Sequence, residues 1–244
     1  MPTALLLSPH LDDAAFSCGG TAALLADAGW EVVLCTLFTQ SVAAPTGFAL
    51  ECQTSKGLSP DVDYMQLRRA EDAAAAVSLG CCVVDWQPLP EAPHRGYTSA
   101  AMLFQPPLAS DDPAPIAAEL RGVLDRYSPD LLLAPACYGR HVDHVQMVRA
   151  LHGLGRTADA YWTDLPYAMR PNPVPPPEGL VDAGELLDID ISSVLENKLD
   201  ACAAYASQLG FQFGGEAGLR KQMGERTLET FRLATPAADV LRQL

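Results

Sequence analysis

Two short clusters of histidine and aspartate hold the side chains of this chain that are best suited to metal and proton chemistry. The first is Pro9-His10-Leu11-Asp12-Asp13, and the second is His141-Val142-Asp143-His144. Imidazole nitrogens and carboxylate oxygens are the usual ligands of a catalytic Zn²⁺ ion, which takes three from the protein and keeps one position open for water. The two clusters together predict a metal centre with groups left over for proton transfer.

Spacing within the clusters suits shared ligation. His10 and Asp13 lie three residues apart, and so do His141 and His144. At the start of a helix this spacing puts both members of a pair on one side of the turn. The residue types alone leave open which of these groups bind the metal and which transfer protons.

The first cluster needs a strand before it and a helix after it. Thr3 to Leu7 is an unbroken apolar run, as expected for a strand that is covered on both faces. Asp12-Asp13 supplies the N-cap and first-turn acids of a helix, which should end at Gly29. The next strand is predicted over Glu31 to Phe38. These segments predict a βαβ unit with the cluster in its first loop.

The second cluster also follows a predicted strand. Asp130 to Ala134 is apolar, Pro135 to Arg140 forms a loop, and a helix is predicted over Val145 to Leu151. Open α/β sheets bind ligands at the carboxyl edge of their strands, so both loops can reach one metal ion there. We therefore predict an α/β, Rossmann-like open and mostly parallel sheet with helices on both faces and the metal site at the carboxyl edge.

The two clusters resemble motifs of the LmbE-like or PIG-L-like N-deacetylases, zinc-dependent enzymes that remove acetyl groups from N-acetylglucosamine-type substrates. The family motif usually has Pro where this chain has Leu11, a change that makes the loop less rigid but leaves the chemistry intact. The resemblance covers most of the chain. Further segments that look like family motifs are Gly19-Gly20, Arg68-Arg69-Ala70-Glu71, Asp190-Ile191-Ser192 with Lys198, Ser207-Gln208 and Glu229-Thr230-Phe231.

The resemblance implies roles for individual residues. One Zn²⁺ ion per chain would be bound by His10, Asp13 and His144. Asp12 would be the general base, His141 would face the developing oxyanion, and Asp143 would orient a histidine. Because an amide is a poor electrophile, its hydrolysis needs an acidified water molecule and a donor for the oxyanion, and these roles supply both.

Some alternatives to these roles remain. Asp12-Asp13 on its own would be no more than a helix N-cap, but its neighbours favour a site. Arg68 is a candidate for substrate contact, or else a solvated helix residue paired with Asp72. Gly19-Gly20 lacks the spacing of a nucleotide-binding loop, so it predicts close helix packing.

The predicted function is removal of an N-acetyl or similar N-acyl group from a small molecule or glycoconjugate that contains an amino sugar. The same fold hosts zinc-dependent hydratases of small unsaturated carboxylates, which is the first alternative. A non-enzymatic metal-binding module is the second. The intact Asp12-Asp13 pair favours hydrolysis over the hydratase, and the presence of every ligand and base candidate argues against the binding module. The resemblance also allows a homo-oligomer.

Length and composition indicate the number of domains, the excluded partners and the cellular location. No linker or charge block interrupts the 244 residues, which predicts a single domain over residues 1–244. A net charge of −14 argues against nucleic acid or anionic membrane as a partner. No apolar run is long enough for a spanning helix, and Met1 to Leu7 leads straight into the charged cluster, unlike a signal peptide. Seven cysteines without Cys-x-x-Cys spacing favour reduced thiols and a cytoplasmic protein.

Two proline-rich stretches interrupt the regular pattern, Pro88 to Pro115 and Pro171 to Pro177. Long irregular segments in a compact domain are usually binding loops or lids. We therefore expect these stretches to shape the substrate pocket.

Overall fold

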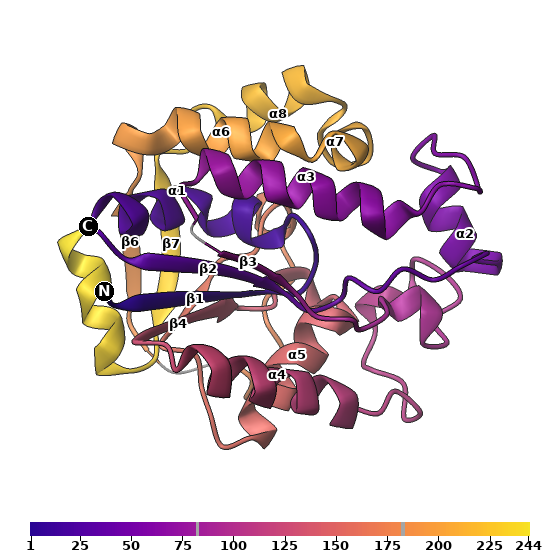
Figure 1. The fold of residues 1–244 in the computed structure, drawn as a ribbon, viewed down its shortest axis with the longest axis horizontal. Helices are drawn as coiled ribbons and strands as arrows, with labels where there is room; N and C mark the ends of the chain where they lie inside the picture. The colour runs from indigo at the N-terminus through magenta and orange to yellow at the C-terminus, as the bar shows by residue number, and fades with distance from the viewer. Residues whose placement is uncertain (82, 182–183) are drawn as a thin grey trace.

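The structure is a computed structural model that describes residues 1–81, 83–181 and 184–244 (Figure 1). Seven strands of these residues form one sheet, in the order β3-β2-β1-β4-β5-β7-β6. The strands are β1 (Thr3–Ser8), β2 (Glu31–Thr36), β3 (Val83–Trp86), β4 (Leu131–Pro135), β5 (Ala160–Trp162), β6 (Leu186–Asp190) and β7 (Leu228–Leu233). The first five pair in parallel, and β7 runs antiparallel to both β5 and β6.

Helices cover both faces of the sheet. They are α1 (Asp13–Asp27), α2 (Gly47–Thr54), α3 (Tyr64–Ser78), α4 (Ala114–Tyr127), α5 (Val142–Gly153), α6 (Leu195–Ala204), α7 (Ala206–Phe213) and α8 (Glu216–Met223). Short 3₁₀ turns are η1 (Ala92–His94), η2 (Met102–Phe104), η3 (Tyr138–Arg140), η4 (Tyr167–Met169), η5 (Ser192–Val194) and η6 (Pro236–Gln243). Figure 1 shows α1, α3 and α6 on one side of the sheet and α4 and α5 on the other.

Alternating residues of the central strand β1 pack into two different apolar cores, one on each face of the sheet. Ala4 and Leu6 of β1 pack into the core beneath α1, α3 and α6. Leu5 and Leu7 point the other way, into the core beneath α4 and α5. A strand buried on both faces needs an apolar residue at every position, which is why Thr3 to Leu7 shows no polar alternation. The predicted Rossmann-like α/β fold is confirmed.

The helix after the second cluster begins earlier than predicted. It was expected at Val145, but α5 starts at Val142. The reason is a cap: the ring Nδ1 of His141 accepts a hydrogen bond from the backbone N–H of Asp143. Histidine is not among the residues that usually cap helices. The early start places His144 in the first turn of α5.

Gly19-Gly20 lies at a kink in α1, where Cys18 has a non-helical φ of −137°. Gly20 has no room for a side chain, because a Cβ there would lie 2.6 Å from Ile191. Its N–H donates to Glu229, whose carboxylate is paired with the buried Lys198 at 2.6 Å. The expected role of this glycine pair in close packing is confirmed.

Two further observations concern the cysteines and the helices of the described residues. Four buried cysteines are free thiols, namely Cys18, Cys35, Cys137 and Cys202. Cys82 lies outside the described residues. Among the helices that the structure describes, none combines the length and the apolar character needed to cross a membrane.

Candidate metal centre and active site

The two clusters meet at the carboxyl edge of the neighbouring strands β1 and β4. His10 lies in the loop between β1 and α1, whereas His141 and His144 begin α5. One ring nitrogen from each of these three histidines lies within 4.8 Å of the others, and all three residues are buried. The structure therefore brings together side chains that lie about half the chain apart in sequence.

The predicted ligand atoms of His10 and His144 both lie close to Asp13 Oδ2. Asp13 Oδ2 lies 3.0 Å from His10 Nδ1 and 3.1 Å from His144 Nε2. A tetrahedral Zn²⁺ ion with bonds of about 2.0–2.1 Å separates its ligand atoms by roughly 3.3 Å. These spacings fit an ion of that size with little rearrangement.

Outer carboxylates turn the two histidine rings toward Asp13 Oδ2. His10 Nε2 lies 2.9 Å from Asp143 Oδ2, and His144 Nδ1 lies 2.8 Å from Asp164 Oδ1. Since an ionised carboxylate only accepts, each of these ring nitrogens is the donor. When the rings are neutral, the other nitrogen of each, which faces Asp13, is left with a lone pair that a metal ion can take. His144 Nε2 is buried and lies 3.1 Å from Asp13 Oδ2, a position that suits a nitrogen that binds a metal ion together with that carboxylate.

The electrostatics around Asp13 favour positive charge. Burial opposes protonation of both rings, yet the Asp13 carboxylate raises the pKa of His144 to about 9. Against the same opposing effect of burial, Asp13 and Asp143 raise the pKa of His10 well above its usual value. A cluster of carboxylates that attracts protons this strongly also suits a divalent cation. The donor set and its surroundings fit a metal ion.

Asp12 lies beside the ligand set in a strained backbone conformation. Its φ of 155° is rare for a residue other than glycine and costs about 1–3 kcal/mol, a strain that is common at functional sites. The N-cap interpretation is wrong for its side chain, which accepts a hydrogen bond from Gln212 Nε2 at 3.1 Å and not from the helix backbone. Burial raises the pKa of Asp12 to about 7, although the nearby Arg68 guanidinium opposes the shift.

Arg68 is buried behind Asp12. Its Nη1 is 2.5 Å from Glu91 Oε1, and its Nη2 lies 3.1 Å from the Leu11 carbonyl and 3.5 Å from Asp12 Oδ1. The alternative pairing with Asp72 does not occur, because that carboxylate accepts from two aromatic side chains instead. The contact of Arg68 with substrate stays a prediction, and its observed contacts are with the loop that holds Asp12.

His141 presents one N–H to the site. Because its Nδ1 accepts from the Asp143 backbone, the hydrogen of the neutral ring is on Nε2. Burial, together with the charge of the neighbouring His10, lowers the pKa of His141 to about 3. The ring is therefore a neutral hydrogen-bond donor, which suits the stabilisation of an oxyanion better than proton donation.

Asp143 orients His10 rather than His141. Its Oδ2 lies 2.9 Å from His10 Nε2 but 4.0 Å from His141 Nδ1. The carboxylate is anchored in turn by Arg95 Nη2 at 2.6 Å and by the backbone N–H of Ala92 at 3.1 Å. Ala92 and Arg95 belong to the first proline-rich stretch, so this stretch fixes a predicted metal ligand.

Replacing Asp143 by Asn should weaken zinc binding by about 10–100-fold, because the change removes the charge that polarises the His10 ring. Competition with a chromophoric chelator would measure this affinity. The exposed Asp112, changed to Asn, serves as the control and should bind zinc like the wild type. A variant with wild-type affinity for zinc but a lowered kcat would instead link Asp143 to His141.

The sequence interpretation missed several residues of the site. Asp164, which orients His144, follows the carboxyl end of β5, where a functional residue is expected in this type of sheet. That strand is only three residues long, which made the position hard to recognise in the sequence. Tyr167 packs edge-on against the ring of His144, with centroids 5.6 Å apart, and Phe104 packs in the same way against His141 at 5.5 Å. Neither aromatic residue belongs to a motif, so the sequence had no signal for them.

A cavity of about 410 Å³ adjoins these side chains. Its lining comes from η2, the segment around η4 and the C-terminal helices: Phe104, Pro166, Tyr167, Met169, Arg170, Pro171, Phe211, Gln212 and Gln222. The cavity connects with the metal-ligand region through Tyr167 and with Asp12 through Gln212. Both proline-rich stretches contribute to this wall, through Phe104 and Pro171, and their role in shaping a substrate pocket stays a prediction.

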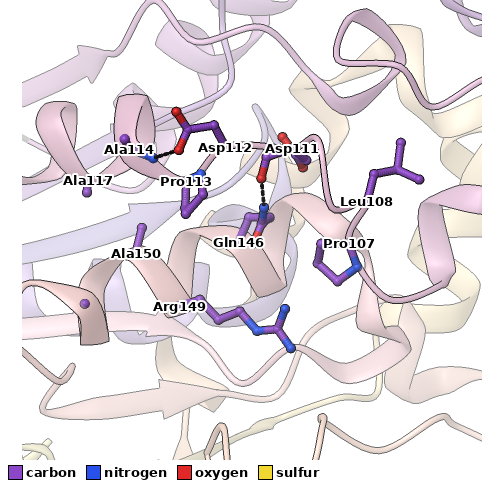
Figure 2. Close-up of a pocket in the computed structure, with 11 residues that line it drawn as sticks. Pro107, Leu108, Asp111, Asp112, Pro113, Ala114, Ala117, Gln146, Arg149 and Ala150 are labelled. Atoms are coloured by element: carbon purple, nitrogen blue, oxygen red, sulfur yellow. Dashed lines mark hydrogen bonds between the residues drawn. The ribbon is translucent and has the colours of Figure 1, made fainter.

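A second cavity, of about 460 Å³, lies between the beginning of α4 and one side of α5 (Figure 2). Gln146 on its wall donates to the backbone carbonyl of Asp111 at 2.9 Å. Arg149 is exposed at its edge. The lining of this cavity holds none of the predicted metal ligands.

Comparisons with known proteins agree with this geometry. Residues 5–153 match the family described as PIG-L: GlcNAc-PI de-N-acetylase. The chain is 32% identical to 2'-N-acetylparomamine deacetylase from Streptomyces fradiae over 84% of this chain and 72% of that protein. It is 26% identical to the zinc-inhibited form of teicoplanin deacetylase Orf2, with a TM-score of 0.77 over 94% of this chain and 97% of the other.

Other solved structures extend the likeness. The A40926 pseudoaglycone deacetylase Dbv21 is 27% identical, with a TM-score of 0.73 over 96% of this chain and 98% of that one. A 4-carboxy-2-hydroxymuconate hydratase from Pseudomonas putida is 20% identical with a TM-score of 0.57, over 97% of each chain, and so shares the fold alone. With the family match, the solved deacetylases and the clustered His and Asp residues in agreement, the chain belongs to the PIG-L family of de-N-acetylases and is a hydrolytic enzyme.

Proposed function

We propose that this enzyme removes an N-acetyl, or similar N-acyl, group from a small molecule or glycoconjugate that contains an amino sugar. The observation that carries the proposal is the meeting of His10, Asp13 and His144 beside the buried carboxylate of Asp12. Two similar proteins are named as deacetylases of 2'-N-acetylparomamine and of teicoplanin, which supports an N-acylated substrate here.

We assign one Zn²⁺ ion per chain to His10, Asp13 and His144. When bound, zinc acidifies a water molecule from a pKa near 15.7 toward about 7 and polarises the amide carbonyl. Asp12 accepts the proton of the attacking water, and the hydrogen bond from Gln212 holds the carboxylate in place for this step. Arg68 supports the same carboxylate from behind.

His141 then stabilises the tetrahedral oxyanion through its Nε2–H. The hydrogen bond from the Asp143 backbone fixes this tautomer and the direction of the ring. A neutral imidazole is sufficient for the role, because a hydrogen bond to the developing charge lowers the barrier without a proton transfer. Asp12 returns its proton to the departing nitrogen as the C–N bond breaks, which releases acetate and the free amine.

The alternatives make different demands on these residues. A hydratase adds water to a carbon–carbon double bond and releases no amine, and a non-enzymatic binding module would turn over neither substrate class. The hydratase likeness extends only to the fold. Two named deacetylases are more similar to this chain, and one of them is named for an N-acetyl substrate, which favours amide hydrolysis.

We expect the zinc-loaded protein to release acetate from at least one member of a panel of N-acetylated amino sugars, in step with the free amine. The panel contains N-acetylglucosamine glycosides, N-acetylated aminoglycosides and N-acylated glycopeptides. Unsaturated dicarboxylates, followed by loss of the enoate absorbance, serve as the comparison. Turnover of a dicarboxylate without any acetate release would replace the proposal with the hydratase, and no turnover of either class would leave the binding module.

A further inference from the structure

Arg170 carries the only charge among the described residues that line the 410 Å³ cavity beside the metal-ligand region. The other lining residues have aromatic, apolar or amide side chains, and none of them is acidic. The chain as a whole has 30 Asp and Glu residues against 16 Lys and Arg residues. A cation without an opposing acid in this cavity therefore differs in sign from the protein around it, and it favours a ligand with negative charge.

Two aromatic rings hold the guanidinium group of Arg170. Its central carbon lies 5.1 Å from the centroid of the Tyr167 ring and 5.7 Å from that of Phe104. Such cation–π contacts position a guanidinium group without an acidic partner. Arg68 and Arg95 pair with carboxylates, whereas Arg170 pairs with none within the described chain. Because Arg170 is also exposed, its N–H donors are accessible to a ligand in the cavity.

The same two rings connect Arg170 with the histidines of the site. Phe104 packs edge-on against His141, with ring centroids 5.5 Å apart, and Tyr167 packs in the same way against His144 at 5.6 Å. The guanidinium group is thus one aromatic ring away from the side chains assigned to the oxyanion and the metal. A sugar ring is about as wide as an aromatic ring. An amino sugar with its acetamido group at the histidines can therefore reach Arg170 with a substituent on a neighbouring carbon.

We infer that Arg170 binds an oxyanionic group of the substrate, a carboxylate or a phosphate. The inference rests on the proposed function and narrows its substrate class to N-acylated amino sugars that carry such a group. The planar guanidinium group can form two parallel hydrogen bonds to either anion.

A second cation lies close to the same cavity. Lys56 Nζ is 5.8 Å from the ring centroid of Phe211, which is part of the cavity lining and is 74% exposed. The ammonium group uses one donor on the Tyr64 hydroxyl, 2.6 Å away. An ammonium group has three donors, so Lys56 retains positive charge and free donors near the cavity. Its position adds to the attraction of an anionic substrate.

A purely structural role is the alternative for Arg170, in which the guanidinium group only keeps the Phe104 and Tyr167 rings in place. Loss of that role would slow the hydrolysis of every substrate, whatever its charge. Loss of an anion-binding group would slow the anionic substrates more than a neutral one. The preference for an anionic over a neutral substrate therefore separates the two roles.

The test uses the N-acetylated amino sugar that the substrate panel identifies, made as three glycosides with linkers of equal length. The group at the end of the linker is a carboxylate, a phosphate or a neutral primary amide. The wild type should prefer one of the anions over the amide by roughly 10- to 100-fold in kcat/KM, the range for a hydrogen-bonded charged group. The stronger preference identifies the anion. Arg170→Gln should lower this preference by about 10-fold or more.

Arg149→Gln is the matched control, because it removes the same charge from an exposed arginine at the edge of the other cavity (Figure 2). This variant should keep the wild-type preference, and elemental analysis should find the same metal content in both variants. The inference fails if the wild type prefers neither anion, if Arg170→Gln keeps the wild-type preference, or if Arg149→Gln loses as much. Failure to release acetate from any N-acetyl compound overturns the proposed function instead.

Discussion

Asp12→Asn should lower kcat by about 10²–10⁴-fold while the protein keeps its metal, the usual size of a general-base contribution. Asparagine has the shape of aspartate and can still accept the hydrogen bond from Gln212, but it cannot take a proton from water. Acetate release measures kcat, and elemental analysis measures the metal content. The two measurements together separate a lost base from a lost metal site.

Asp72→Asn is the control for this variant. Asp72 is also a buried aspartate near the site, but its carboxylate bonds to Trp86 and Tyr205 and to none of the metal ligands. The kcat of this variant should stay within about threefold of the wild-type value, since a change of that size corresponds to under 1 kcal/mol of activation barrier. The same small loss in Asp12→Asn would remove Asp12 from the role of base.

His144→Ala should leave the protein without bound zinc and without measurable acetate release. His144 is the proposed ligand with the least freedom, because it is buried, is held by Asp164 at 2.8 Å, and directs its other ring nitrogen at Asp13 Oδ2, 3.1 Å away. Removing one of three protein ligands takes away much of the binding free energy of the ion. Elemental analysis of the purified variant, before and after zinc is added, measures the effect.

His152→Ala is the matched control on the same helix, since His152 bonds to Tyr161 at the far end of α5. It should retain about one metal ion per chain. His141→Ala should also retain the metal, and should lose about 10²–10³-fold in kcat with little change in KM, as expected for one oxyanion donor. If His141→Ala lost the metal and His144→Ala kept it, the roles of these two residues would be exchanged.

Local patterns were enough to predict the fold and the meeting of the two His and Asp clusters. The apolar runs at Thr3 to Leu7 and Asp130 to Ala134 predicted parallel strands because a strand covered on both faces cannot alternate in polarity. The two polar clusters follow these strands directly. Since parallel strands end at the same edge of the sheet, their meeting there followed from the order of elements alone.

Side-chain partners were harder to predict, because they depend on contacts between distant segments. The sequence left open which histidine Asp143 orients, and only the structure shows that it is His10. It gave no reason to connect Arg68 with Glu91, or Arg95 with Asp143, because these pairs span two elements each. The capping role of His141 was likewise hidden by its unusual residue type.

The sequence by itself determined the chemistry that is available: which donors and acids exist, which strands they follow and which family they resemble. Tertiary structure decided how each group is oriented and supported. The start of α5, the segment after β5 and the placement of α7 bring Asp143, Asp164 and Gln212 to the groups they contact. The physical reason is the distance along the chain over which each effect acts. Periodicity and capping act over a few residues, whereas the ring orientation of a ligand or the charge of a buried acid depends on whatever side chain packs against it in the folded chain.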